Sequence, residues 1–530
     1  MNIKYRQKTM KRTRWMLALV ASGLLAASCS TGGDNQPEFL GGITSFNGGS
    51  PLISDTNGGS AESPAGTAAS DPSGWSGDQF NAYFDNPFVE TSAKPISTFS
   101  VDADGASYAI VRQYLLRDYK VNPSSVRIEE LLNYFTFNYA APVGDESVAI
   151  SAEVGDCPWT PGHYLLQLGI KGRELSAAEM PRANFVFLID VSGSMDISDK
   201  LPLLKRGLKQ LLHELNPDDR ISIVTYSGEV KKVLSSTPVS ELSTIEEAID
   251  RLEARGATNG GKALEMAYEE ALANYDPAFN NRIIMGTDGD FNLGVTTTNA
   301  LVEMVENYAD KGIYMTCLGF GLGNLNDAMM ECVSNAGNGT YHFIDSEQEM
   351  MRVFVHERNQ FVSVANDAKC QLTFNSHVVS KYRLLGYENR IMADDDFEND
   401  MKDAGEIGAG QTITALYEIV LADEKPTDMA GKDLATFDFR YKQKLGGESR
   451  ALQRKIPYGR VTEKYNRPDD FYFAAGVAAY GMLLRESPYK GDATFKMAEQ
   501  LVEMGLGFDP HGYRAELKSL IRKLREPDDE

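Results

Sequence analysis

Between about residues 183 and 360, short apolar runs alternate with amphipathic segments, and this alternation constrains the fold more than any other feature. The runs are rich in Val, Ile and Tyr, which favour strands. Between the first two runs, Leu201, Leu204, Leu208, Leu211 and Leu215 share one face of a predicted helix. Strand and helix in alternation predict a doubly wound, mostly parallel sheet in an α/β fold. The runs are NFVFLID, ISIVTYS, NRIIMGTD, IYMTCLGFG and TYHFID.

Polar side chains follow the ends of these predicted strands. The first run ends on Asp190, with Ser192 and Ser194 directly after it. Another run ends on Asp288, and Thr258 lies between glycines ahead of a helical segment. Ligands of doubly wound sheets bind beyond the carboxyl ends of the strands. Because all five side chains offer oxygen, which hard cations such as Mg2+ prefer, we expect a divalent cation here, with a position left open for a partner's carboxylate.

The loops DVSGSM, GATNGG and TDGDFN, in this order and in these strand contexts, resemble the metal-ion-dependent adhesion site of von Willebrand factor type A domains. The resemblance implies that Ser192 and Ser194 bind the metal directly, and that Thr258 binds it directly or through water. It implies that Asp190 and Asp288 act mostly through water. The implied cofactor is Mg2+, with Ca2+ or Mn2+ as alternatives, and the implied partner is another protein that presents Asp or Glu.

The flanking segments extend the resemblance to nearly everything from about residue 96 onward. FSVDADGASY, CPWTPGHYLLQLGIKGRE, YRLLGYENR, DAGEIGAGQTITALYEIV and DPHGYRAEL are similar to segments of bacterial lipoproteins that carry a von Willebrand-associated N-terminal domain and a C-terminal domain of unknown function. Alternating strands on both sides of the α/β region predict that it is inserted into a β-sandwich-like domain. The expected parts are a small N-terminal α/β domain (96–145), a β segment that pairs with the C-terminal domain (146–180), the type A domain (181–362), a β-rich domain (363–460) and a C-terminal helical region (461–530).

The first residues have the layout of a secretion signal. Six Lys and Arg residues precede an apolar run from Trp15 to Ala27, and AASCS follows, so that Cys29 resembles the lipidated cysteine of bacterial lipoproteins. We expect a signal peptide over 1–28 and a flexible linker over 29–95, where small and polar residues dominate. These features predict a protein of the bacterial cell envelope, lipid-anchored on the periplasmic or outer face of a membrane. An ordinary signal peptide is the alternative.

Charge and motif spacing exclude two classes of partner. Asp and Glu number 75 against 52 Lys and Arg, and a net charge of −23 would repel nucleic acid. GATNGGK nearly matches a phosphate-binding loop, but Ala263 replaces the Ser or Thr that would hold Mg2+, and a helical segment precedes it where a strand is required. The sequence therefore predicts neither a nucleic acid nor a nucleotide as ligand.

The segment SVDADG, residues 100–105, resembles the start of a calcium loop. Ser100 occupies the first ligand position of such a loop, and Val111 stands where the closing glutamate belongs. We interpret the segment as structural.

Four cysteines follow Cys29, and their spacing matches neither a disulfide scaffold nor a zinc site. Their pairing stays open. They are Cys157, Cys317, Cys332 and Cys370.

These features predict a tethered binding protein that is not an enzyme. One alternative is a periplasmic metal-dependent hydrolase, although no residue suggests a leaving-group acid or a second metal. Another is a structural subunit that binds its partner independently of metal. No catalytic residue is predicted.

Overall fold

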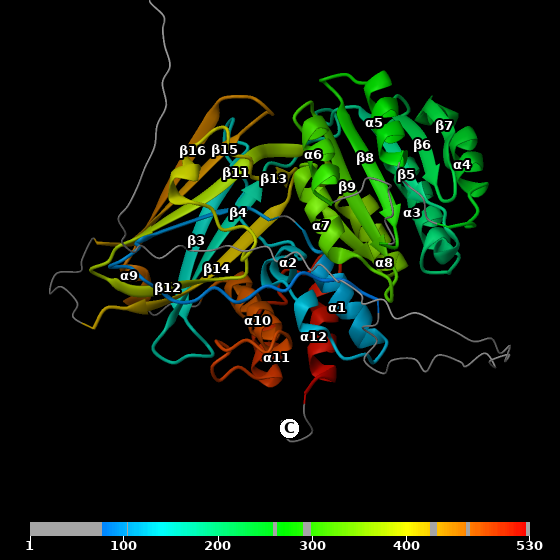
Figure 1. Ribbon diagram of the computed structural model, residues 1–530. Coiled ribbons are helices and arrows are strands. Elements are labelled where there is room, and N and C mark those ends of the chain that lie inside the picture. Colours follow the sequence, from blue (N-terminus) through cyan, green and yellow to red (C-terminus); the bar gives the residue numbers. More distant parts are fainter. Residues whose placement is uncertain are drawn as a thin grey trace, which may run out of the picture. The chain divides into compact units, whose positions relative to one another are not determined.

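The structure, a computed structural model, describes residues 77–102, 104–257, 262–289, 298–423, 432–462 and 467–525 (Figure 1). The region with alternating strand and helix signals forms a six-stranded sheet in the order β10-β9-β8-β5-β6-β7. All neighbours in it are parallel except β7, which runs antiparallel to β6. Its strands are β5 (Ala183–Asp190), β6 (Arg220–Tyr226), β7 (Val230–Pro238), β8 (Asn280–Thr287), β9 (Ile313–Phe320) and β10 (Tyr341–Ile344).

Helices cover both faces of this sheet, which explains why its central strand is apolar at almost every position. Phe185 and Phe187 of β5 share a core with α3, α4 and α8, whereas Val186 and Leu188 share one with α5, α6 and α7. Alternate side chains of a strand point to opposite faces, so burial on both sides requires an unbroken apolar run. The helices are α3 (Leu201–Glu214), α4 (Leu242–Asp250), α5 (Ala263–Ala273), α6 (Thr298–Ala309), α7 (Asp327–Ala336) and α8 (Glu347–Met351).

Two antiparallel sheets form a β-sandwich beside the α/β region (Figure 1). One has the order β1-β12-β14-β4-β3; the other has the order β13-β11-β15-β16, with β2 also paired to β11. Apolar side chains of both sheets, such as Leu168 and Phe437, belong to one buried cluster. The strands are β1 (Val89–Glu90), β2 (Ile96–Ser100), β3 (Val148–Asp156), β4 (Tyr164–Gly172), β11 (Ser363–Phe374), β12 (Val379–Leu385), β13 (Gly405–Gly408), β14 (Thr412–Leu421), β15 (Asp433–Lys442) and β16 (Ser449–Pro457).

The sandwich is built from chain segments on both sides of the α/β region. β4 pairs with β14 from Tyr164 opposite Ile419 to Lys171 opposite Thr412. The predicted fold class, a mostly parallel α/β sheet inserted in a β-sandwich-like domain, is confirmed. The structure adds that β2, at the start of the segment expected to form the small N-terminal domain, pairs with β11 of the sandwich over Ile96–Ser100.

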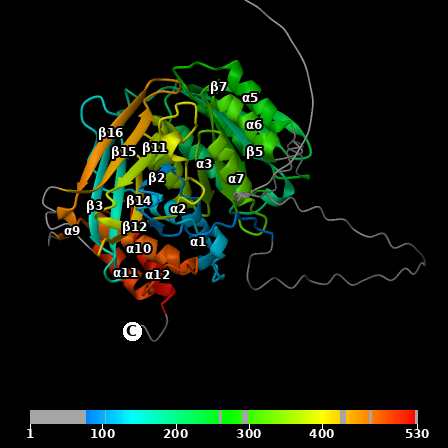
Figure 2. The same cartoon turned by 60° about the vertical axis from the view of Figure 1, so that its left-hand side comes forward.

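The N-terminal and C-terminal helices share one apolar core, although about 350 residues separate them in sequence. Helices α1 (Ala106–Leu116) and α2 (Ile128–Asn133) lie beside α10 (Asp469–Leu484), α11 (Phe495–Met504) and α12 (Tyr513–Lys523) (Figure 2). Their side chains belong to one buried cluster. The same cluster includes the α5, α6 and α7 side of the α/β sheet. Short elements complete the described chain: η1 (Pro123–Ser125), η2 (Gly193–Met195), η3 (Val239–Glu241), η4 (Arg352–His356), η5 (Arg358–Phe361), η6 (Asp394–Phe397) and α9 (Gly459–Thr462).

Helix α10 is buried along nearly its whole length, as expected for a core helix. Across the described residues, no helix combines the length and the apolar composition that crossing a membrane needs. Cysteines 157, 317, 332 and 370 are all free thiols in this part of the chain, and only Cys332 is exposed.

His342 of β10 makes the acid stability of this fold testable. The side chain is buried, and burial together with the charge of Arg352 lowers its pKa from about 6.5 to about 3. Below pH 6.5 the unfolded chain therefore binds a proton at this position that the folded chain does not. Stability should be lost as the pH falls from 6.5 towards 3, by about 2 kcal/mol at pH 5.

His342→Gln removes this titration. Between pH 7 and pH 5, the free energy of unfolding measured in urea should fall by about 2 kcal/mol less in the variant than in the unsubstituted chain. Other titrating groups occur in both proteins and cancel in the comparison. Equal losses would show that His342 does not titrate in this way.

Candidate metal site

Two of the predicted strand ends meet at one edge of the α/β sheet. Strand β5 ends on Asp190, and Asp288 directly follows β8, its neighbour in the sheet. Both carboxylates are fully buried. Parallel neighbours end at the same edge, so side chains almost 100 residues apart in sequence face the same space.

The loop after β5 is held in place by its own hydrogen bonds. The backbone N–H of Ser192 donates to Oδ1 of Asp190 over 2.8 Å, and Thr287 donates its hydroxyl to Oδ2 over 3.1 Å. The hydroxyl oxygens of Ser192 and Ser194 lie 3.0 Å apart, on either side of the first residue of the turn η2. Asp190 thus fixes the backbone that presents both serine hydroxyls.

A further loop reaches the same place through backbone contacts. Gly193 donates its N–H to the carbonyl of Gly256 over 3.0 Å, and Arg255 donates to the carbonyl of Val191 over 2.7 Å. These bonds bring the chain to within two residues of the position of Thr258. Thr258 itself lies outside the described residues, as does Cys29.

Sequence reasoning missed one charged residue of the site, Lys200. Its ammonium group donates to Oδ2 of Asp288 over 2.8 Å and to Oδ1 of Asn324 over 3.2 Å, and only 4% of the residue is exposed. The sequence feature that could have pointed to Lys200 is its position directly before the helical segment that starts at Leu201. Without the fold, nothing in the sequence pairs that lysine with Asp288.

The surroundings shift the pKa values of the two carboxylates in opposite directions. Burial raises the pKa of Asp190 to about 6, and the negative charge of Asp288 adds to this rise. Burial also acts to raise the pKa of Asp288, but the hydrogen bond and the charge of Lys200 hold it below its usual value. The two acids and one lysine leave the described part of the site with a net charge of about −1, so an additional cation is attracted.

The chemistry of the donors fits a hard divalent cation. Asp190, Ser192, Ser194 and Asp288 present only oxygen, and the carboxylates are removed from bulk water. Oxygen ligands with few charges suit Mg2+, which binds one or two carboxylates and keeps several waters. These residues can therefore hold the ion that the sequence predicts.

Models of three known families match this chain. The von Willebrand factor type A domain matches residues 184–355. A model described as von Willebrand factor matches residues 75–167, and the C-terminal part of the uncharacterized protein YfbK matches residues 359–526. Together they account for most of the described residues.

Individual proteins are similar to all or part of this chain. The uncharacterized protein YfbK of Escherichia coli is 37% identical over 466 residues, covering 84% of this chain and 80% of that protein. Inter alpha-trypsin inhibitor heavy chain 4 of Mus musculus is 28% identical over 185 residues, 33% of this chain and 19% of that protein. Among solved structures, von Willebrand factor type A from Catenulispora acidiphila covers 73% of this chain and 91% of its own, at 17% identity and a TM-score of 0.43.

Proposed function

Because this chain belongs to the family of YfbK and contains a von Willebrand factor type A domain, we propose that it binds another protein through a divalent cation. Type A domains are in general interaction domains without catalytic activity. The proposed function is accordingly that of a binding protein and not of an enzyme. Its partner presents an Asp or Glu side chain to the ion.

The observation that carries this proposal is the cluster of oxygen donors at the ends of β5 and β8. In the proposed complex, Ser192 and Ser194 bind Mg2+ directly, and Thr258 binds it directly or through water. Asp190 and Asp288 act mostly through water, and Ca2+ or Mn2+ are the alternative ions. In this proposal the cation supplies the positive charge, and the partner's carboxylate takes a coordination position that the protein's own ligands leave open.

The net negative charge of the chain is a reason why binding an acidic partner needs a local cation. A net charge of −23 repels an acidic partner at long range. Binding through a carboxylate then requires a positive charge at the point of contact, and a bound divalent ion provides it. This reasoning predicts that capture of the partner depends on metal.

A pull-down from membrane extract with the full chain tests the proposal. Partners should be retained in buffer with Mg2+, released by a chelator, and retained again when Mg2+ is restored. A titration of Mg2+ by calorimetry on the same protein checks that the ion binds at all. Partners that stay bound in the presence of the chelator would contradict the proposal and favour a structural subunit. Turnover of a substrate would favour a metal-dependent hydrolase.

We further propose that Cys29 anchors the protein to a membrane of the bacterial cell envelope. The junction AASCS after a charged and then apolar start supports this. Cys29→Ser should abolish labelling by a radioactive fatty acid and move the protein from the membrane fraction to the soluble fraction. Cys332→Ser is the matched control, because Cys332 is an exposed thiol outside this junction and its loss should change neither result. Membrane association of the Cys29 variant, with its protein partners removed, would count against the anchor.

A further inference from the structure

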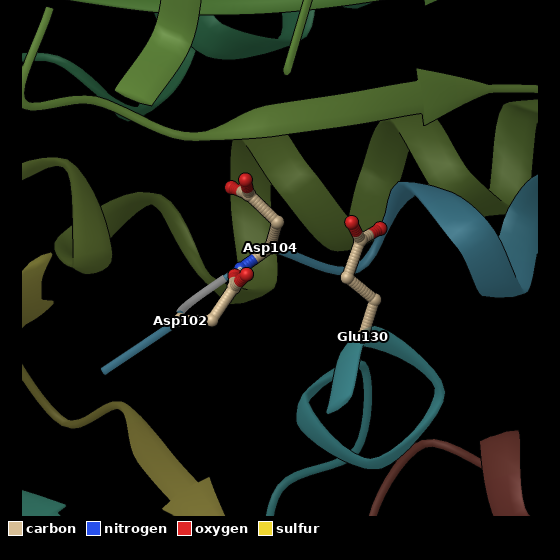
Figure 3. A group of neighbouring side chains, drawn as sticks. All are labelled: Asp102, Asp104 and Glu130. Atoms are coloured by element: carbon tan, nitrogen blue, oxygen red, sulfur yellow. Dashed lines mark hydrogen bonds between the residues drawn. The ribbon is translucent and has the colours of Figure 1, made fainter. Parts of the chain in front are cut away.

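A second group of carboxylates lies outside the site at Asp190 and Asp288. Asp102 and Asp104 lie two and four residues beyond the end of β2 at Ser100, and Glu130 comes from helix α2 (Figure 3). One oxygen from each of the three side chains lies within 4.8 Å of the other two. At most 2% of each residue is exposed, so this is a buried group and not a patch of surface acids.

One oxygen of this group has no hydrogen-bond partner among the described residues. Oδ2 of Asp104 is buried without one, and its nearest cation is Nη2 of Arg390 at 3.8 Å. Oδ1 of Asp104 accepts the backbone N–H of Tyr341 over 2.7 Å. Buried carboxylate oxygens are normally hydrogen-bonded or bound to a metal ion, so Oδ2, whose contact with Arg390 is too long for a hydrogen bond, is able to accept a cation.

The other oxygens of the group are already oriented. Asp102 accepts the backbone N–H of Asp104 at Oδ1 over 2.9 Å, and Arg390 donates to its Oδ2 over 2.8 Å. Glu130 accepts the N–H of Ser107 over 2.8 Å and also binds Arg127. These contacts hold the three carboxylates close together despite their mutual repulsion.

Negative charge exceeds positive charge around this group. Among the described residues, at least five carboxylates interact there, and five of them share two arginines. Burial, together with the charges of Asp102 and Glu130, raises the pKa of Asp104 well above its usual value. A proton or a further cation must balance the excess. The acids are Asp102, Asp104, Glu130, Asp327 and Glu331, and the arginines are Arg127 and Arg390.

A cavity of about 520 Å³ connects with the group. Asp104, Glu331 and Arg390 line it, and so do Asp403, just before β13, and Glu406, within β13. In the part of the chain that the structure describes, Oε1 of Glu406 is also buried without a hydrogen-bond partner. The cavity offers an ion a path to Asp104 and has room for the waters that would complete its coordination.

We propose that Asp102, Asp104 and Glu130 form a second cation site, which takes Ca2+. Ca2+ accepts six to eight oxygen ligands in a flexible geometry, so three neighbouring carboxylates and several waters can share one ion. Mg2+ usually binds only one or two carboxylates and demands a near-ideal octahedron, which suits a group of three carboxylates less well. Asp102 and Asp104 occupy the third and fifth positions of the calcium-loop pattern that begins at Ser100.

Glu130 replaces the closing glutamate that the pattern lacks. Val111 stands at the twelfth position, which led the sequence to predict a purely structural loop. In the folded chain, α2 brings a carboxylate from 26 residues beyond Asp104 to the same place. Because Asp104 also accepts the N–H of Tyr341 in β10, the ion ties the N-terminal segment to the α/β sheet.

Titration of Ca2+ by calorimetry tests this site in the full chain. Asp190→Ala is introduced first, to weaken the other metal site, and the resulting protein should still bind one Ca2+. Adding Asp104→Asn should weaken that binding at least about 30-fold, since the change removes the free carboxylate charge but keeps an oxygen for Tyr341. Asp403→Asn is the matched control, because Asp403 lines the cavity outside the group of three.

No Ca2+ binding by the Asp190→Ala chain at millimolar concentrations would overturn the proposal, as would equal affinities with and without Asp104→Asn. Such results would mean that a proton balances Asp104. A second measurement does not depend on the variant folding. Crystals of the unsubstituted chain soaked in Tb3+ should show an anomalous peak among the three carboxylates, and a peak only near Asp288 would overturn the site.

Discussion

Replacing Asp190 by alanine is expected to lower the affinity for Mg2+ by about 100-fold. The described site holds two carboxylates and Lys200, so removing Asp190 leaves no net negative charge to attract the ion. The change also removes the acceptor that orients Ser192 through its backbone N–H. Calorimetric titration of Mg2+ measures the loss, and capture of the partner should fall in parallel.

Asp196→Ala is the matched control for this prediction. Asp196 lies in the same loop, but its side chain is exposed, and the change should leave Mg2+ affinity within about twofold. Circular dichroism should show both variants folded, because Asp190 lies at a strand end and not within the apolar core. Unchanged Mg2+ affinity in folded Asp190→Ala would rule out this edge of the sheet as the metal site.

Replacing Arg112 by methionine is expected to cost about 3–5 kcal/mol of unfolding free energy. The guanidinium of Arg112, in α1, lies 2.6 Å from Asp345 and 2.7 Å from Glu349, and all three side chains are 1% exposed. Its Nη1 also donates to Tyr134 over 2.9 Å. Methionine fills much of the same volume but leaves buried carboxylates without this partner, and the cost of an unpaired buried charge is large. Urea unfolding at neutral pH measures the change.

Arg182→Met provides the comparison for an exposed ion pair. Arg182 contacts Asp218 at 2.9 Å, but the two side chains are 56% and 68% exposed. Solvent screens such pairs, so the expected loss is below about 1 kcal/mol. A loss of similar size in both variants would show that the buried contacts of Arg112 with Asp345 and Glu349 contribute no more to stability than an exposed ion pair does.

Much of the architecture was predictable because it depends on local patterns. Strand β5 must be apolar on both faces when helices cover both sides of a parallel sheet, and its sequence shows this directly. The positions of Asp190 and Asp288 followed from the same rule, since each comes at the end of an apolar run. The roles of Thr258 and Cys29 stay predictions, because both residues lie outside the described part of the chain.

Contacts between distant segments were decided by the tertiary structure alone. No local pattern pairs Lys200 with Asp288, β2 with β11, or Glu130 with Asp104. Each of these contacts joins side chains or strands that come together only in the folded protein. Such contacts produce no periodic pattern of residue types, so the sequence does not reveal them. By itself the sequence determined which segments are strands and helices and which polar residues end them, because hydrophobic periodicity is a local property. Which charged groups are neighbours depends on the packed structure, because folding brings together residues that lie far apart in the chain. In the buried, low-dielectric interior their charges then interact strongly.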